Sequence, residues 1–135
     1  MSYIILEHTA DLKIKFKGAT LAELFEEAGR AVMRIVNKSA GHKPTKVMRE
    51  IEIMAQDSTA LLIDWLNELL SLSHINKEVY TDIKIVKLDD NSLQAEIKGV
   101  RVERFNKDIK AATYHEAEVK KSEKGGWETI IVFDI

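Results

Sequence analysis

Apolar and polar residues alternate near the N-terminus in a pattern typical of β-strands. Residues 3–6 form a short apolar run, and residues 12–17 alternate strictly between apolar side chains and lysine. A period of two places one set of side chains on a buried face and the lysines in water. The pattern therefore predicts two strands, separated by the polar residues 7–11.

Two later segments show the mixed three- and four-residue spacing of apolar positions that indicates an amphipathic helix. The first follows Thr20, which forms a capping box with Glu23, and Asn37 predicts where it ends. The second is capped by Asp57 or Ser58 and has the strongest periodic signal in the chain. Its apolar positions are Leu61, Leu62, Trp65, Leu66, Leu69 and Leu70. We expect this second helix to be a main source of stability.

Strand patterns also follow each helix. One predicted strand covers residues 47–55, between the helices. The remaining predicted strands cover residues 80–86, 93–97, 109–120 and 127–133. Short turns join most of the late strands, which therefore pair antiparallel. We predict a single α+β domain over residues 1–135, in which two amphipathic helices pack on a mostly antiparallel sheet.

Three glycines predict special backbone geometry. Gly99 lies inside a strand pattern, which indicates a bulge or the close approach of another backbone. Gly125 and Gly126 are adjacent between two predicted strands, a combination typical of a hairpin turn.

Composition narrows the class of protein. The chain has 135 residues, of which 45% are hydrophobic, which is ordinary for a globular protein. It has no cysteine, so disulfides, thiolate catalysis and zinc–cysteine sites are excluded. Its formal net charge of -2 argues against binding nucleic acid through bulk positive charge. No signal peptide or membrane-spanning run is visible, and we expect a cytoplasmic protein.

The two ends of the chain carry the main candidate site. Asp11 closes the polar segment 7–11, and Asp134 stands beside Ile135. If the ends meet, two side-chain carboxylates and the C-terminal carboxylate converge, which is a donor set for calcium or magnesium. The alternative is a pair of solvated acids at unrelated loop ends, and the spacing alone favours that alternative.

Two further groups of polar residues have a functional and a structural interpretation. His8 and Thr9 can orient Asp11 or a phosphate oxygen, or they can simply cap their own loop. The spacing of the histidines gives no support for a histidine–zinc site. On the second helix, Trp65 is expected in the core, and Asn67 is expected to face solvent or act as a cap.

A third candidate is the predicted strand face that carries Lys110, Ala112 and Tyr114. Small residues leave space there, so the face can present a lysine and a tyrosine to a partner or an anion. It can equally be a packed strand whose lysine is solvated, and the sequence leaves both interpretations open.

Four segments together resemble the archease family. They are E-H-T-A-D at residues 7–11, L-L-I-D-W-L-N-E-L-L at 61–70, I-K-A-A-T-Y-H at 109–115 and V-F-D-I at 132–135. The capped helix after Thr20 also matches in kind and place. The segments span the whole chain in one order, so the combination is specific although each piece alone is weak.

This resemblance implies a non-catalytic protein cofactor of the RtcB-type RNA ligase, which joins exons in tRNA splicing. Archeases promote guanylylation of a ligase histidine, support repeated turnover and broaden nucleotide use. The resemblance carries the family's metal site over to Asp11, Asp134 and Ile135, and its functional lysine to Lys110. The implied cofactor is a divalent metal, calcium, with magnesium or manganese as alternatives. RNA is reached only through the ligase.

Two other functions remain open at this point. An independent metal-dependent hydrolase would turn over phosphate esters by itself. A chaperone-like binding module would suppress the aggregation of unrelated proteins and would be insensitive to changes at Asp11.

Overall fold

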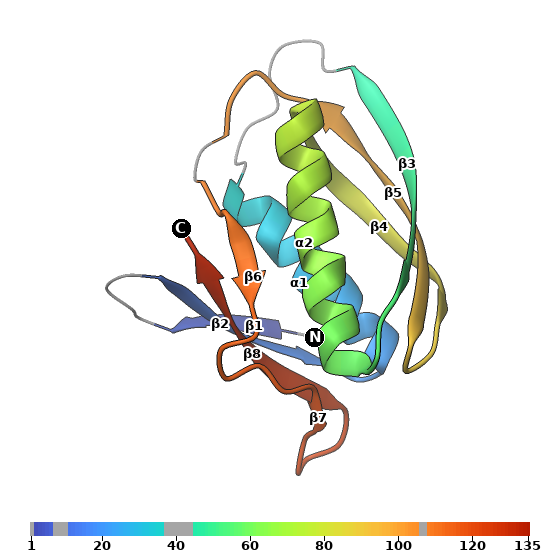
Figure 1. Ribbon diagram of the computed structural model, residues 1–135, viewed down its shortest axis with the longest axis vertical. Helices are drawn as coiled ribbons and strands as arrows, with labels where there is room; N and C mark the ends of the chain where they lie inside the picture. Colours follow the sequence, from blue (N-terminus) through green and yellow to red (C-terminus); the bar gives the residue numbers. More distant parts are fainter. Residues whose placement is uncertain (1, 7–10, 37–44, 106–107) are drawn as a thin grey trace.

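Strands from the two ends of the chain form one sheet, and strands from its middle form another (Figure 1). This computed structural model describes residues 2–6, 11–36, 45–105 and 108–135. The elements are β1 (Ser2–Leu6), β2 (Leu12–Gly18), α1 (Leu21–Val36), β3 (Lys46–Met54), α2 (Ser58–Asn76), β4 (Glu78–Leu88), β5 (Ser92–Arg101), β6 (Ala111–Thr113), β7 (Lys120–Lys121) and β8 (Trp127–Asp134).

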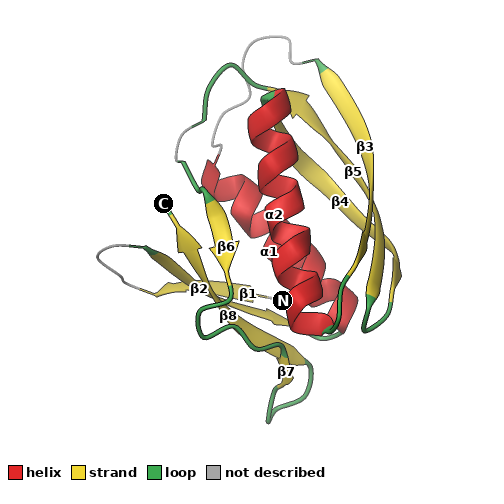
Figure 2. Ribbon diagram, viewed as in Figure 1, coloured by secondary structure: helices red, strands yellow, loops and turns green. Residues whose placement is uncertain are grey.

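Every strand pairing in both sheets is antiparallel. The five-stranded sheet has the order β1-β2-β8-β6, with β7 also paired to β8, and the three-stranded sheet has the order β3-β5-β4. Figure 2 shows both helices between the two sheets. The predicted fold class, two helices packed on antiparallel sheet, is confirmed. The sequence analysis predicted one sheet, and the structure has two. The second sheet explains why α2 is buried on more than one side.

Both helices begin where their capping residues predict. At α1, the Glu23 backbone N–H donates to Thr20 Oγ1 at 3.1 Å, and Glu23 Oε2 accepts from the Ala19 N–H at 2.9 Å. At α2, Asp57 is the N-cap and its Oδ1 accepts from the Ala60 N–H at 2.8 Å. These bonds satisfy backbone donors that have no partner within the helix. The predicted end of α1 at Asn37 lies outside the described residues.

The core contains the apolar side chains of both helices and the inner faces of both sheets. Trp65 on α2 is fully buried, and its indole Nε1–H donates to the Phe25 carbonyl of α1 at 2.9 Å. Burying a side chain of this size is worth about 1.5–3 kcal/mol. The expected place of Trp65 in the core is therefore confirmed. No helix in the described part of the chain is long and apolar enough to cross a membrane.

The predicted strand over residues 109–120 is wrong for most of its length. Within that range, Ala111–Thr113 form β6 and Lys120 begins β7, and both short strands pair with β8. Between them the chain turns, with the Ala117 N–H donating to the Tyr114 carbonyl at 3.0 Å and Glu116 at a φ of 60°. A left-handed residue interrupts the extended backbone that a strand requires.

Gly99 on β5 lies against the backbone of β4, as its position in a strand predicted. A Cβ atom built on Gly99 would lie 1.9 Å from the Val79 carbonyl oxygen and 2.7 Å from the Tyr80 Cα. The β4–β5 register shifts next to this contact, between Tyr80 and Asp82. Only a residue without a side chain fits this approach of two strands.

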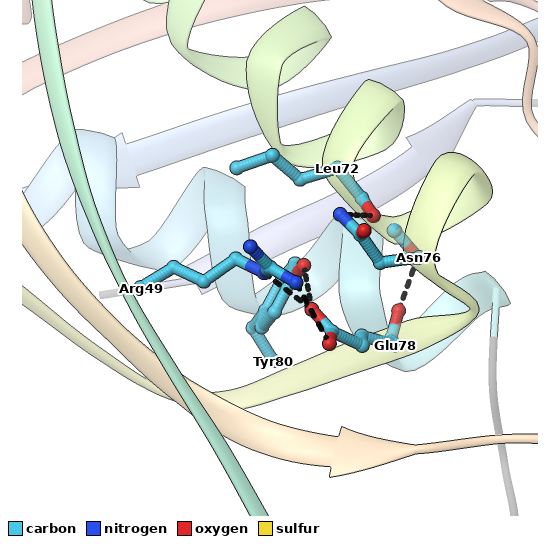
Figure 3. A network of polar contacts seen from close by, with 6 residues as sticks. Arg49, Leu72, Asn76, Glu78 and Tyr80 are labelled. Carbon is cyan, nitrogen blue, oxygen red and sulfur yellow. Dashed lines mark hydrogen bonds and ion pairs between the residues drawn. The ribbon is translucent and has the colours of Figure 1, made fainter.

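A buried glutamate, Glu78, connects α2, β3 and β4 through its carboxylate and its backbone carbonyl (Figure 3). Glu78 is fully buried and accepts hydrogen bonds from Arg49 at 2.6 and 3.1 Å and from the Tyr80 hydroxyl at 2.7 Å. The Arg49 hydrogen bonds hold the pKa of Glu78 below its ordinary value, and burial raises the pKa of Tyr80. The Glu78 carbonyl also accepts from Ser73 Oγ of α2 at 2.5 Å.

We predict that Gly99→Ala destabilises the protein by roughly 3 kcal/mol, because its methyl group would overlap backbone atoms that cannot rotate away. Chemical denaturation measures the change. Gly29→Ala is the matched control, since the nearest atoms to a Cβ there belong to side chains rather than to backbone, at 3.0 to 3.3 Å, against 1.9 Å to a carbonyl oxygen at Gly99. A Gly99→Ala protein as stable as the Gly29→Ala protein would contradict the close approach.

We predict that Arg49→Met costs about 3 kcal/mol at neutral pH, because it leaves the buried Glu78 carboxylate without its charged partner. The lowered pKa of Glu78 means that its stabilisation is present above the unfolded pKa and is lost as the pH falls through the folded pKa. The difference in the free energy of unfolding between wild type and variant should therefore shrink as the pH falls below the pKa of an ordinary carboxyl group. Denaturation curves at several pH values measure this.

The control is Lys15→Met, which removes the Lys15–Glu128 ion pair of 3.7 Å on the outside of the five-stranded sheet. The two side chains are 33% and 18% exposed and the pair is long, and ion pairs near the surface are worth about 0–1 kcal/mol, so this variant should stay close to wild type. An Arg49→Met protein that behaves like the control would show that the Glu78 carboxylate needs no partner.

Candidate functional site

The pairing of β2 with β8 brings Asp11 and Asp134 to the same end of the five-stranded sheet. The last paired residues are Leu12 and Phe133. Asp11 directly precedes Leu12, and Asp134 directly follows Phe133. Because the strands are antiparallel neighbours, the two acids leave the sheet side by side at adjacent strands. Segments more than a hundred residues apart in the sequence therefore meet at one place.

Strand β6 adds a lysine on the other side of β8. Ala111 pairs with Asp134, and the backbone N–H of Lys110 donates to the Asp134 carbonyl at 2.8 Å. The side chains of Lys110 and Asp134 are exposed, Asp11 is half-buried, and Ile135 is exposed. We call these four residues, Asp11, Lys110, Asp134 and Ile135, the sheet tip. Figure 1 shows the C-terminus beside β6 at this tip.

The sheet tip combines carboxylate oxygens with one ammonium group. Oxygen donors of this kind suit hard divalent cations such as calcium or magnesium. Within the described ranges, however, no three histidine, cysteine, aspartate or glutamate side chains are grouped closely enough to hold a metal ion. Asp11 and Asp134 supply two carboxylates, and a full site would need further oxygens. The metal site therefore stays a prediction.

Two of the predicted functional residues cannot be placed. His8 and Thr9 belong to residues 7–10, which lie outside the described residues. Their predicted role beside Asp11 is therefore untested.

The predicted shared face of Lys110, Ala112 and Tyr114 is wrong. Ala112 is only 5% exposed and packs in the core, while Tyr114 is 58% exposed. The reason is that β6 contains only three residues, so alternation does not extend to Lys110 or Tyr114. Desolvation raises the pKa of Tyr114, and the negative charges of Asp64 and Asp57 raise it further by a smaller amount.

The structure also assigns a role to a residue that the sequence analysis placed in solvent. Asn67 of α2 makes two hydrogen bonds to the backbone of β6 at Ala112. No local pattern identifies such a contact, because the partner lies 45 residues away. Its place in the L-L-I-D-W-L-N-E-L-L segment was the one available signal.

The comparison with protein families decides which family this is. The model of the Archease protein family matches residues 3–135. The chain belongs to the archease family. The resemblance to the archease family is therefore confirmed over nearly the whole chain.

Curated relatives agree with this assignment. The chain is 33% identical over 141 residues to the protein archease of Methanosarcina acetivorans, covering 98% of this chain and 95% of that one. It is 34% identical over 137 residues to the protein archease of Pyrococcus abyssi, covering 96% and 95%. Similarity on this scale, over almost complete chains, supports a shared fold and a shared set of elements.

Two solved structures have the same fold. The solution structure of Methanobacterium thermoautotrophicum protein 1598 matches with a TM-score of 0.77 and 25% identity, covering 98% of both chains. The crystal structure of an archease from Thermotoga maritima, described as a possible chaperone, matches with a TM-score of 0.68 and 22% identity. It covers 96% of this chain and 94% of that chain. The arrangement of two helices and antiparallel sheets is thus an archease fold.

Proposed function

We propose that this archease is a non-catalytic activator of an RtcB-type RNA ligase in the cytoplasm. It promotes transfer of GMP to the ligase histidine, supports multiple turnover and broadens nucleotide use. Membership of the archease family supports this proposal. The observation that carries it is the sheet tip, where three strands present two acids and a lysine at one end of the molecule.

The tip fits a divalent cation through its donor chemistry. Asp11, Asp134 and the backbone oxygens of Ile135 would hold it, calcium first and magnesium or manganese as alternatives. A bound cation of this class supplies positive charge that neutralises phosphate oxygens.

The residues of the tip would act on the nucleotide by position and charge. The ammonium group of Lys110 is exposed and its backbone is fixed to Asp134 by a 2.8 Å hydrogen bond. From there it can pair with a nucleotide phosphate at the ligase active site, while the ligase histidine attacks the α-phosphorus and pyrophosphate leaves. Asp134 is on the adjacent strand β8, and Asp11 precedes β2, the next strand, at the same end of the sheet.

We predict that Asp11→Asn and Lys110→Ala each lower stimulated guanylylation by about tenfold or more, because a hydrogen bond to a charged group is worth about 1.5–3 kcal/mol. The measurement is covalent labelling of limiting ligase with GTP carrying a radioactive α-phosphate, in the presence of divalent metal, with and without each variant. Unfolding curves establish that both variants remain folded.

Matched controls carry the same chemical changes at other places. Asp90→Asn lies in the β4–β5 turn, and Lys124→Ala lies in the β7–β8 turn, and both side chains are exposed. Both proteins should stimulate the ligase like wild type. Full stimulation by the Asp11→Asn and Lys110→Ala proteins would refute the role of the tip.

The same preparations separate the other two functions. Release of phosphate from esters by the archease alone would indicate a hydrolase. Suppression of aggregation of unrelated proteins, unchanged in Asp11→Asn, together with no effect on a cognate ligase, would indicate a chaperone-like module.

A further inference from the structure

The side-chain amide of Asn67 takes the place of a neighbouring strand. Strand β6 lies at one end of the five-stranded sheet, so only one of its edges pairs with another strand, β8. On the other edge, Asn67 Nδ2 donates to the Ala112 carbonyl at 3.1 Å, and Asn67 Oδ1 accepts from the Ala112 N–H at 2.7 Å. A carboxamide has one donor side and one acceptor side, which match the two backbone groups of a single residue.

Two other side chains of α2 contact the same stretch of chain, residues 108–119, which we call the strap. Thr59 Oγ1 accepts from the Val119 N–H at 3.0 Å, near the end of the strap. His74 Nε2 lies 3.5 Å from Asp108 Oδ1, at its start. Thr59, Asn67 and His74 are eight and seven residues apart, about two helical turns each, so they lie along one side of α2. The helix therefore contacts the strap at its start, its middle and its end.

The two Asn67 hydrogen bonds fit one register of β6. The strand pairs with β8 over only three residues, which specifies register weakly. A slip of one residue would move the backbone by about 3.3 Å and turn each side chain to the opposite face. In the observed register the Asn67 amide meets Ala112, whose small side chain is buried, and Lys110 lies two residues earlier at the sheet tip.

We infer that Asn67 is a positioning residue that fixes the register of β6 and so holds Lys110 beside Asp134 at the sheet tip. This inference rests on the proposed function for its consequence in the ligase reaction, but not for its structural part. Asn67 itself stays at the side of the strap and does not belong to the sheet tip.

The structural part is tested without the ligase, by amide hydrogen exchange of the whole archease measured by NMR. The Lys110 N–H is protected by its bond to the Asp134 carbonyl. In Asn67→Ala it should exchange roughly tenfold or more faster, because local opening of β6 becomes easier. Unchanged exchange at Lys110 would overturn the inference, whatever the ligase does.

Asn91→Ala is the matched control. The Asn91 side chain also makes two hydrogen bonds to backbone, to the Ala55 carbonyl at 3.2 Å and the Gln56 carbonyl at 2.8 Å, beside the three-stranded sheet. Both variants should lower the unfolding temperature, Asn67→Ala the more, because its hydrogen bonds are partly buried and those of Asn91 are exposed. Exchange at Lys110 should accelerate only in Asn67→Ala, so a general loss of stability cannot explain the result.

The consequence for the ligase is tested by guanylylation with Asn67→Ala, Lys110→Ala and the double variant. Asn67→Ala should lose stimulation while Asn91→Ala keeps it, and the double variant should be no worse than Lys110→Ala, because Asn67 acts through Lys110. Multiplied losses in the double variant would overturn the inference. Full stimulation by all three, with faster exchange at Lys110, would retain the register role of Asn67 and refute the proposed function of the tip.

Discussion

The antiparallel pairing of β8 with β2 is the constraint on which the site depends. It joins the two ends of the chain, and its terminal pair, Leu12 and Phe133, is buried at 7% and 0% exposure. Because side chains alternate between faces, burial of this pair fixes the register, and a slip of one residue would expose it. The same burial therefore determines that Asp11 and Asp134 emerge together. An acidic pair at the surface is positioned by an apolar pair in the core.

Local features of the fold were readable from the sequence because their partners are close in the chain. The capping residues Thr20 and Asp57 fall in this class. The close approach at Gly99 was readable for another reason, because a glycine inside a strand pattern is itself the signal, although its partner Val79 is on the neighbouring strand. The Arg49–Glu78 pair does not, because its partners are 29 residues apart and meet only after β3, β5 and β4 pair. In the sequence, Glu78 is indistinguishable from the many surface acids. The sequence itself singled out the residues of the tip as candidates, but spacing alone favoured solvated acids, and the family resemblance was what favoured a shared site.

The strap shows how a strand pattern can mislead. Residues 109–120 have strand-like composition, yet α2 occupies the edge where a further strand would pair. Asn67 makes hydrogen bonds to the backbone of one residue of β6, Ala112, and Thr59 accepts a hydrogen bond from the backbone N–H of Val119 farther along. Side chains of a helix thus provide hydrogen bonds that a strand would otherwise provide, so the strap stays ordered without extending the sheet. Sequence periodicity reports which side chains are buried and leaves open what covers the backbone.

The Arg49–Glu78 pair and the sheet tip differ in their exposure to solvent. This difference indicates different roles. The Glu78 carboxylate is buried, and Arg49 and Tyr80 together donate three hydrogen bonds to it, so it is committed to holding β3 and β4 together, while the Glu78 backbone carbonyl accepts a hydrogen bond from α2. At the tip the backbone is fixed by β8, while the charged ends of Lys110 and Asp134 are exposed. A fixed backbone with accessible charge is what recognition of a partner requires, because little ordering remains to be done on binding. The tip, unlike the buried pair, has the exposed charge that the proposed function requires.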